Sequence, residues 1–222
     1  MNWSRIISAI GQMSNARTLW GTQGTDELEG TGGSDLIIGW ARDGFPRGDD
    51  GDGLSGLAGD DILVGGDGND GLYGGKGDDY SFGGKGRDVL IDNGGNNVLV
   101  GDVGRDGLFA DNGNDELHGG DGNDYLSGAG GLDRLWGGSG SDTFGFGVDS
   151  GTQRNVSRVQ DFEDDLDTLS FSDTLGVTSA ADALDQAQVV RGNTVFTFDT
   201  GLVVVIQGVT DKSLLLDDIA IV

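Results

Sequence analysis

The chain has 222 residues, 45 of them glycine, with a formal net charge of −25 and a pI of about 4.1. This charge makes nucleic acid and anionic membrane surfaces poor direct partners, because both are negatively charged. The sequence contains no cysteine and no apolar run long enough for a transmembrane helix, so it excludes a disulfide framework and a membrane-spanning helix.

The N-terminal segment shows helical spacing of apolar side chains. These are Trp3, Ile6, Ile7, Ile10 and Met13. We predict an amphipathic helical cap over residues 1–20, which either covers the open end of the fold that follows or docks on a partner or a membrane, and its two basic residues give membrane binding little support. The segment has no long apolar core and no clear cleavage site, so no cleaved signal peptide is expected.

A nine-residue repeat starts at Gly21 and runs without a gap from Gly56 to Gly145. Most units read G-G-x-G-x-D-x-L-x, as in GGDGNDGLY (65–73) and GGKGRDVLI (83–91). Glycine at places 1, 2 and 4 suits a tight turn, and the apolar place 8 suits a short strand that points into a core. Two units would form one coil of a solenoid, so each turn should stack on the turn two units later.

The register of the repeat is irregular over residues 39–55. Gly44 and Gly53 stand where aspartate is expected, and the only proline of the chain, Pro46, lies between them. We interpret this stretch as a bulge or loop that interrupts the stacking.

Place 6 is aspartate in most units, and stacking aligns these residues into two ladders. One ladder contains Asp61, Asp79, Asn97, Asp115 and Asp133, and the other contains Asp70, Asp88, Asp106, Asp124 and Asp142. Backbone carbonyls should converge on the same turns, among them those of Gly65, Gly74, Gly83, Gly101 and Gly119. Such an oxygen-only cage suits Ca²⁺ better than Zn²⁺, copper or Mg²⁺.

The ladders predict about eight calcium ions, and more if Asp26 and Asp35 also bind across the irregular stretch. Without metal, carboxylates about 4.8 Å apart on successive turns repel each other by about 0.9 kcal/mol per pair even at the dielectric constant of water. The many glycines add an ordering cost. Folding should therefore depend on calcium.

After Gly145 the repeat stops, and residues 146–222 carry alternating apolar strands. We expect strands near 156–162, 167–171, 193–200 and 202–209, with a helical stretch at 179–187. The chain is thus divided into a cap (1–20), a repeat domain (21–145) and a small β-rich domain (146–222) that closes the far end.

The repeat and the run that follows it, SDTFGFG…VSRVQDFEDDLDTLSF, resemble RTX (hemolysin-type calcium-binding repeat) proteins. They are similar to the C-terminal region of serralysin-type metalloproteases and to the R-modules of alginate epimerases. The ending DDIAIV resembles the uncleaved signal of type I secretion, although four residues rather than three follow Asp218. The resemblance implies an all-β parallel β-roll that a Gram-negative bacterium secretes through type I machinery and that folds in extracellular calcium.

The catalytic parts of these families are missing. The chain has no HExxH motif and a single histidine, His118, at place 9 of its unit. We therefore predict a non-catalytic, secreted calcium-binding protein with a structural or adhesive role at the cell surface or in the matrix. The alternative is a polysaccharide-binding module that works beside a separate enzyme.

Places 7 and 9 should point outward, yet they are unusually apolar. On one sheet they carry Ile62, Val64, Tyr80, Phe82, Val98 and Val100, and on the other Tyr73, Val89, Ile91 and Phe109. Either the N-terminal helix or the C-terminal domain covers this surface, or it is an interface with a second copy or another partner. The third alternative is that the inward and outward assignment is wrong.

Overall fold

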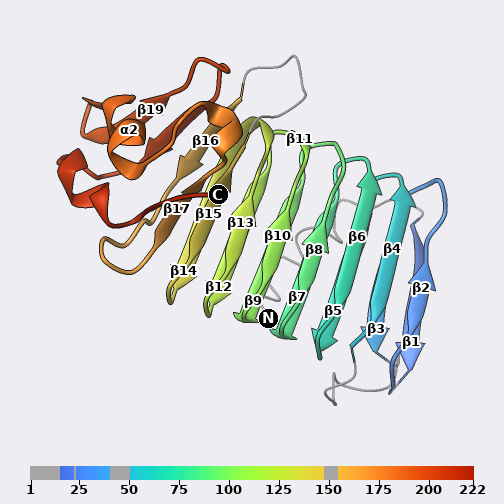
Figure 1. Ribbon diagram of the computed structural model, residues 1–222. Helices are drawn as coiled ribbons and strands as arrows, with labels where there is room; N and C mark the ends of the chain where they lie inside the picture. The colour runs from blue at the N-terminus through green and yellow to red at the C-terminus, as the bar shows by residue number, and fades with distance from the viewer. Residues whose placement is uncertain (1–15, 23, 41–50, 148–154) are drawn as a thin grey trace.

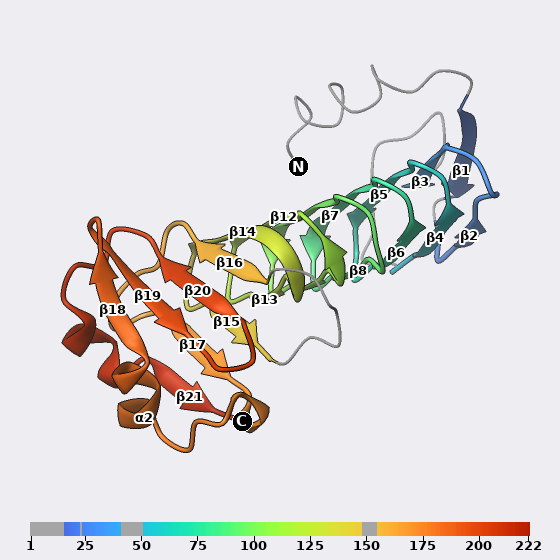
Figure 2. The same cartoon turned by 90° about the horizontal axis from the view of Figure 1, so that it is seen from above.

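The computed structural model describes residues 16–22, 24–40, 51–147 and 155–222. Two long sheets run side by side along the molecule, and the chain alternates between them as it winds from one end to the other (Figure 1, Figure 2). Three short helices join the C-terminal strands: η1 (Asp173–Leu175), α2 (Ala180–Asp185) and η2 (Lys212–Leu216).

We call the larger sheet sheet A and the smaller one sheet B. Sheet A contains, in spatial order, β1 (Arg17–Thr22), β3 (Asp35–Trp40), β5 (Ile62–Asp67), β7 (Tyr80–Gly86), β9 (Val98–Gly104), β12 (Glu116–Asp121), β14 (Gly130–Ser139), β16 (Val156–Val159), β20 (Val203–Ile206), β19 (Asn193–Thr197) and β18 (Ala187–Val190), and β11 (Asn112–Gly113) pairs with β14. Sheet B contains β2 (Glu27–Glu29), β4 (Gly53–Ala58), β6 (Gly71–Lys76), β8 (Val89–Ile91), β10 (Gly107–Phe109), β13 (Tyr125–Ser127), β15 (Thr143–Phe146), β17 (Thr168–Phe171) and β21 (Ile219–Ile221).

The register confirms the predicted parallel β-roll. In the regular part of the repeat, Ile62 pairs with Tyr80, so each strand aligns with the strand two units later. Across the irregular stretch the pairing continues, with Leu36 opposite Ile62 and Leu28 opposite Leu54. Residues 39–40 and 53–55 belong to β3 and β4, so the sheets are not interrupted there, and the pairing offset places an enlarged connection between these two strands, within one coil.

The repeated glycines meet two different needs. Gly66 and Gly68, at places 2 and 4, have φ values of 130° and 133°, which side chains other than glycine rarely adopt. Gly65, at place 1, is needed for space, because a Cβ there would lie 2.3 Å from Oδ2 of Asp70. The turn thus depends on glycine for backbone conformation at two places and for space at the third.

The core of the roll is a column of place-8 side chains. Leu63, Leu72, Leu90, Leu99, Leu108, Leu117, Leu126, Leu135 and Phe144 are all buried. The same core continues through Phe171, Phe196 and Ile206 of the C-terminal region. Strands β16, β20, β17 and β21 also extend the two sheets of the roll, so the region after residue 145 shares both sheets and core with the repeats.

The predicted N-terminal cap falls mostly outside the described residues. Its last part is not helical, because Arg17–Trp20 belong to β1, which pairs in parallel with β3. The roll therefore begins before Gly21, because the backbone of Arg17–Trp20 pairs with β3 and so extends sheet A by one strand. No helix of the described residues is long and apolar enough to cross a membrane.

Four of the six apolar side chains at places 7 and 9 of sheet A are buried, and Tyr80 and Val98 are half-buried. Ile62, Val64, Phe82 and Val100 form a second cluster, separate from the main core, with exposed fractions of 8% or less. The corresponding side chains of sheet B are exposed, and Phe109 keeps 38% of its surface accessible. The two faces thus differ: these side chains of sheet A have little accessible surface, whereas the corresponding side chains on the outer face of sheet B are exposed.

The difference between the faces predicts unequal effects of one substitution at the same repeat place. Phe82→Ser should lower the free energy of unfolding in calcium by about 3 kcal/mol, since it removes a fully buried ring. Phe109→Ser, also at place 9, should cost less than about 1 kcal/mol. Denaturant unfolding followed by circular dichroism measures both. Equal effects would contradict the buried state of the sheet A face.

Candidate metal centre

The place-6 residues form two hydrogen-bonded ladders along the edges of the roll. In each, the backbone N–H of one residue donates to Oδ1 of the residue in the next coil. Along the first ladder these bonds join Asp35, Asp61, Asp79, Asn97, Asp115 and Asp133, at 2.6 to 3.1 Å. Along the second they join Asp26, Asp52, Asp70, Asp88, Asp106, Asp124, Asp142 and Asp167, at 2.7 to 2.9 Å. Every predicted ladder residue therefore lies where eighteen-residue stacking places it.

The second carboxylate oxygen of these residues has no hydrogen-bond partner. Oδ2 is buried and unpartnered in Asp61, Asp70, Asp79, Asp88, Asp106, Asp115, Asp124 and Asp142. A buried charged oxygen without a donor is strongly unfavourable unless a cation balances it. The repeating set of such oxygens is the observation that points to bound metal.

Glycine carbonyls of the next coil face these oxygens. A Cβ built on Gly65 would lie 2.3 Å from Oδ2 of Asp70 and 2.8 Å from the carbonyl oxygen of Gly83, so all three groups converge. Gly101 stands in the same way between Asp106 and the carbonyl of Gly119. The predicted glycines therefore place carbonyl oxygens beside the aspartates.

Two ladder members were missed in the sequence. Gly53 pairs with Gly71 and so occupies place 7, which puts Asp52 at place 6, whereas Gly53 was assigned to the aspartate place. The error arose because the register was counted forward through the enlarged connection, and counting backward from Leu54 would have found Asp52. Asp167, in the region after the last repeat, ends the second ladder and also accepts a bond from the N–H of Glu163 at 2.9 Å.

Asp92 is a further residue that the pattern did not identify. It occupies place 1, normally glycine, and is 1% exposed with an unpartnered Oδ2. A Cβ on Gly74 would lie within 3 Å of Oδ2 of both Asp92 and Asp79. The ladder neighbour of Asp79 is Asn97, which has no carboxylate. Asp92 therefore supplies beside Asp79 the carboxylate that Asn97 lacks.

The first members of the ladders are held by threonine. Oδ2 of Asp35 accepts hydrogen bonds from the backbone N–H of Thr31 at 2.6 Å and from its hydroxyl at 2.9 Å. Asp26 accepts a bond from the hydroxyl of Thr22 at 3.0 Å. These partners orient the two carboxylates at the end of the roll, where fewer coils surround them.

Burial shifts the acidity of the ladders. It raises the pKa of Asp88 to about 8 and that of Asp61, Asp70, Asp79, Asp92, Asp115 and Asp142 to about 7. The pKa of Asp106 and that of Asp124 rise to about 6 for the same reason. Backbone N–H donors oppose the shift, and neighbouring carboxylates add to it at most positions. Without metal, the roll thus favours protonated carboxyls near neutral pH.

The donor set fits calcium. Carboxylate and carbonyl oxygens are the ligands that Ca²⁺ takes in flexible geometry, whereas Zn²⁺ prefers nitrogen and sulfur. The only histidine of the sequence, His118, stacks its ring on Trp136 with centroids 4.3 Å apart on sheet A. It does not belong to either ladder.

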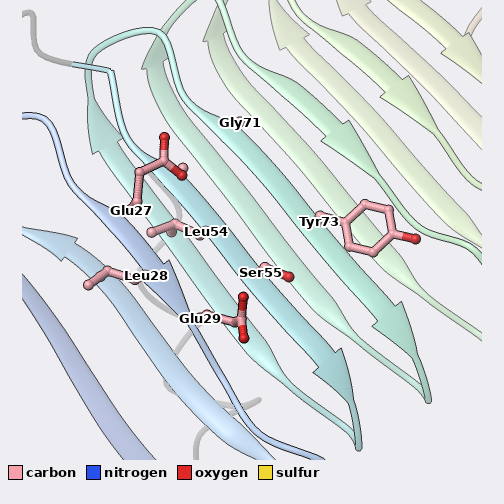
Figure 3. Close-up of a pocket in the computed structure, with 8 residues that line it drawn as sticks. Glu27, Leu28, Glu29, Leu54, Ser55, Gly71 and Tyr73 are labelled. Atoms are coloured by element: carbon pink, nitrogen blue, oxygen red, sulfur yellow. The ribbon is translucent and has the colours of Figure 1, made fainter.

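The open outer face of sheet B carries two hollows. One is lined by Glu27, Glu29, Ser55 and Tyr73 among others, and Figure 3 shows these side chains on neighbouring strands. The second, which we call the arginine groove, has a volume of about 440 Å³. Its lining includes Arg87, Arg105, Phe109 and Tyr125, together with three ladder residues, Asp88, Asp106 and Asp124.

Among known proteins, the model of the RTX calcium-binding nonapeptide repeat matches this chain in four copies, at residues 19–41, 47–81, 73–108 and 109–144. The extracellular lipase LipA from Serratia marcescens is similar in structure, with 18% identity and a TM-score of 0.35 over 95% of this chain and 40% of the lipase. The AlgE6R3 subunit of the Azotobacter vinelandii mannuronan C5-epimerase has 20% identity and a TM-score of 0.31 over 94% of this chain and 85% of that subunit. No curated protein matches the chain.

The fold and the ladders define a calcium-binding parallel β-roll. The matched repeats cover more than half of the sequence, and the chain belongs to the RTX calcium-binding nonapeptide repeat family. Both TM-scores are low, so this assignment rests on the repeats. The chain spans less than half the length of the lipase.

The raised pKa values predict that protons partly replace calcium. A carboxyl with a raised folded-state pKa stabilises the fold below its unfolded pKa of about 3.8, and this stabilisation is lost as pH rises through about 6 to 8. In excess chelator, the protein should therefore gain β-sheet signal in circular dichroism when the pH falls from 8 to 5.5.

Calcium affinity should change in the opposite direction over the same interval. It should rise between pH 6 and 8, with protons released on binding, because the metal and the protons compete for the same carboxylates. Calorimetry in buffers of different ionisation enthalpy measures the released protons. An affinity that is constant over this range would contradict the raised pKa values.

Proposed function

We propose that this chain is a secreted, non-catalytic calcium-binding β-roll that folds when it meets extracellular calcium and then serves as a structural or adhesive element. The supporting observation is the pair of ladders, in which buried carboxylate oxygens recur without a protein partner. With its buried carboxylates ionised and no metal bound, such a roll has low stability, and divalent cations bound to these carboxylates stabilise it. Folding would thus be delayed until calcium is plentiful.

The number of ions follows from the ladder bonds. The first ladder has five neighbouring pairs and the second has seven. One ion per pair would bring about twelve ions with a charge of about +24, close to the net charge of −25 on the chain. The acid excess is then the ligand supply of the roll.

Secretion is part of the same proposal. The absence of cysteine suits a chain that stays unfolded and unbridged until export, and low cytosolic calcium would keep it so. The C-terminal sequence DDIAIV, which resembles a type I secretion signal, contains the whole of β21 together with the two aspartates before it and Val222 after it. Type I machinery of a Gram-negative bacterium is the partner that this sequence would engage.

Circular dichroism in chelator and in calcium tests the proposed function. At pH 7.5, the chelated chain should lack most of its β-sheet signal, and millimolar Ca²⁺ should restore it. At ten times its Kd each site adds about 1.4 kcal/mol, so about eight sites suffice for the stability of a whole domain. Mg²⁺ at equal concentration should restore little. A chain that keeps its spectrum and melting temperature in chelator would refute metal-coupled folding.

The arginine groove favours a second candidate, binding of a carboxylated polysaccharide beside a separate enzyme. Arg87 and Arg105 occupy the same repeat place on successive coils, and no ion pair or side-chain hydrogen bond of either is found within the described residues. Next to them, the rings of Phe109 and Tyr125 lie 5.5 Å apart and 38% exposed. Guanidinium groups pair with carboxylates, and exposed aromatic rings offer an apolar face to a sugar.

Binding to a polyuronate in calcium tests the groove. Arg87→Ser with Arg105→Ser should lower the affinity at least tenfold. Lys76→Ser with Arg134→Ser removes the same charge from other exposed places and should leave the affinity within about twofold. Calorimetry with a polyuronate and with a neutral glycan of equal length gives both comparisons. Equal binding of the two glycans, or of the two variants, would refute this candidate.

A further inference from the structure

Three carboxylates outside the repeats meet at the C-terminal end of the roll. Strands β17 and β21 pair in parallel, with Leu169 opposite Ile219, so the turn before β17 lies beside the segment before β21 (Figure 2). Asp165 comes from the first and Asp217 and Asp218 from the second. Each offers one carboxylate oxygen, and these three oxygens lie within 4.8 Å of one another.

The burial of Asp218 distinguishes this group from an ordinary acidic surface. Its side chain is 6% exposed, and its Oδ2 has no hydrogen-bond partner. The backbone N–H of Asp165 donates to the Asp218 carboxylate, and the Asp164 carboxyl lies beside it, so Asp218 is held against the opposite segment. No lysine or arginine of the described part of the chain forms an ion pair with the three residues. A buried carboxylate oxygen beside further carboxylates is strongly unfavourable as an anion unless a proton or a cation balances it.

We propose that Asp165, Asp217 and Asp218 bind one calcium ion that is separate from the repeat ladders. The ligands are all oxygen, as Ca²⁺ requires, and the set contains no nitrogen or sulfur that would favour zinc. Asp218 supplies the buried ligand. Asp165 and Asp217 are exposed, so the ion can enter with part of its water shell and keep water in its remaining positions.

The ion would tie the last strand to the roll. Strand β21 has three residues and stands at the edge of sheet B. Backbone bonds hold it to β17 and the residues that follow, from the N–H of Leu169 to Asp218 and from the N–H of Val222 to Phe171. A calcium ion shared by the two segments adds a bridge at the start of β21, so the order of the C-terminal strand depends on calcium independently of the repeats.

The test compares a double variant with a control variant. In both, the number of bound ions and the hydrogen exchange of β21 are measured. Asp165→Asn with Asp217→Asn removes two exposed carboxylates, keeps side-chain size and leaves the buried residue in place. Asn also tolerates the φ of 61° at Asp165. The control, Asp185→Asn with Asp199→Asn, removes the same charge from two exposed residues of the same region that lie outside the group.

Native mass spectrometry of the full chain at saturating calcium should find one ion fewer in the first variant and the wild-type number in the control. Hydrogen exchange in calcium should show amides of β21 exchanging at least tenfold faster in the first variant, while those of β7 and β9 keep their protection. An unchanged ion number, or the same loss in the control, overturns the site.

Two further arms keep the test conclusive. Asp217→Asn alone gives the same comparison if the double variant does not form the roll, because it changes a single exposed side chain. Protected β7 and β9 amides separate this site from the ladders: if they are protected even in chelator, the metal-coupled folding of the roll fails, while a lost ion in the variant still supports the site.

Discussion

The fold depends on a repulsive contact that the chain cannot avoid. Because each turn stacks directly on the next, the aspartate of every coil is buried beside the aspartate of its neighbour. In the inner rows of the ladders, one oxygen of the carboxylate accepts from a backbone N–H of the preceding coil, and the other is left without a donor. The stacking that builds the core thus also builds a row of buried negative charge, and the structure requires protons or metal to neutralise it.

The two roles of the aspartate are coupled through one side chain. Oδ1 fixes the register between coils, and Oδ2 points toward the glycine carbonyl of the next coil. A bound ion therefore stabilises the orientation that the hydrogen bond selects, and the hydrogen bond places the oxygen for the ion. This coupling explains why Asp92 is accommodated at a glycine place: it supplies charge where Asn97 supplies only the hydrogen-bond acceptor.

The repeat predicted the roll, the inward leucines and the members of both ladders, because a strict period fixes which residues stack. It did not predict what lies outside the period. Asp52 was missed because the enlarged connection hides the register, and Asp167 because no repeat surrounds it. The sequence also did not show that the C-terminal region continues the roll. The nine-residue repeat stops after residue 145, while the strands that follow continue the same two sheets.

The burial of Phe82 shows a different limit of sequence reasoning. Its place in the repeat is the same as that of Phe109, and the pattern gives both an outward direction. Whether an outward side chain is covered depends on segments far away along the chain, which a local period does not contain. The spacing therefore identified an apolar surface on each sheet, and only the three-dimensional arrangement distinguished the covered face from the open one.

The enlarged connection also has a mechanical consequence. In a roll, the backbone hydrogen bonds between coils lie along the long axis, so a pull along this axis loads the coil interfaces in series and the weakest separates first. The strands before the enlarged connection are joined to the rest by β2–β4 and β3–β5, each paired over three residues, whereas in the next coil β5 pairs with β7 over five and β6 with β8 over three. An axial force would thus detach the first coils, those that precede the enlarged connection, and leave the rest of the rod intact.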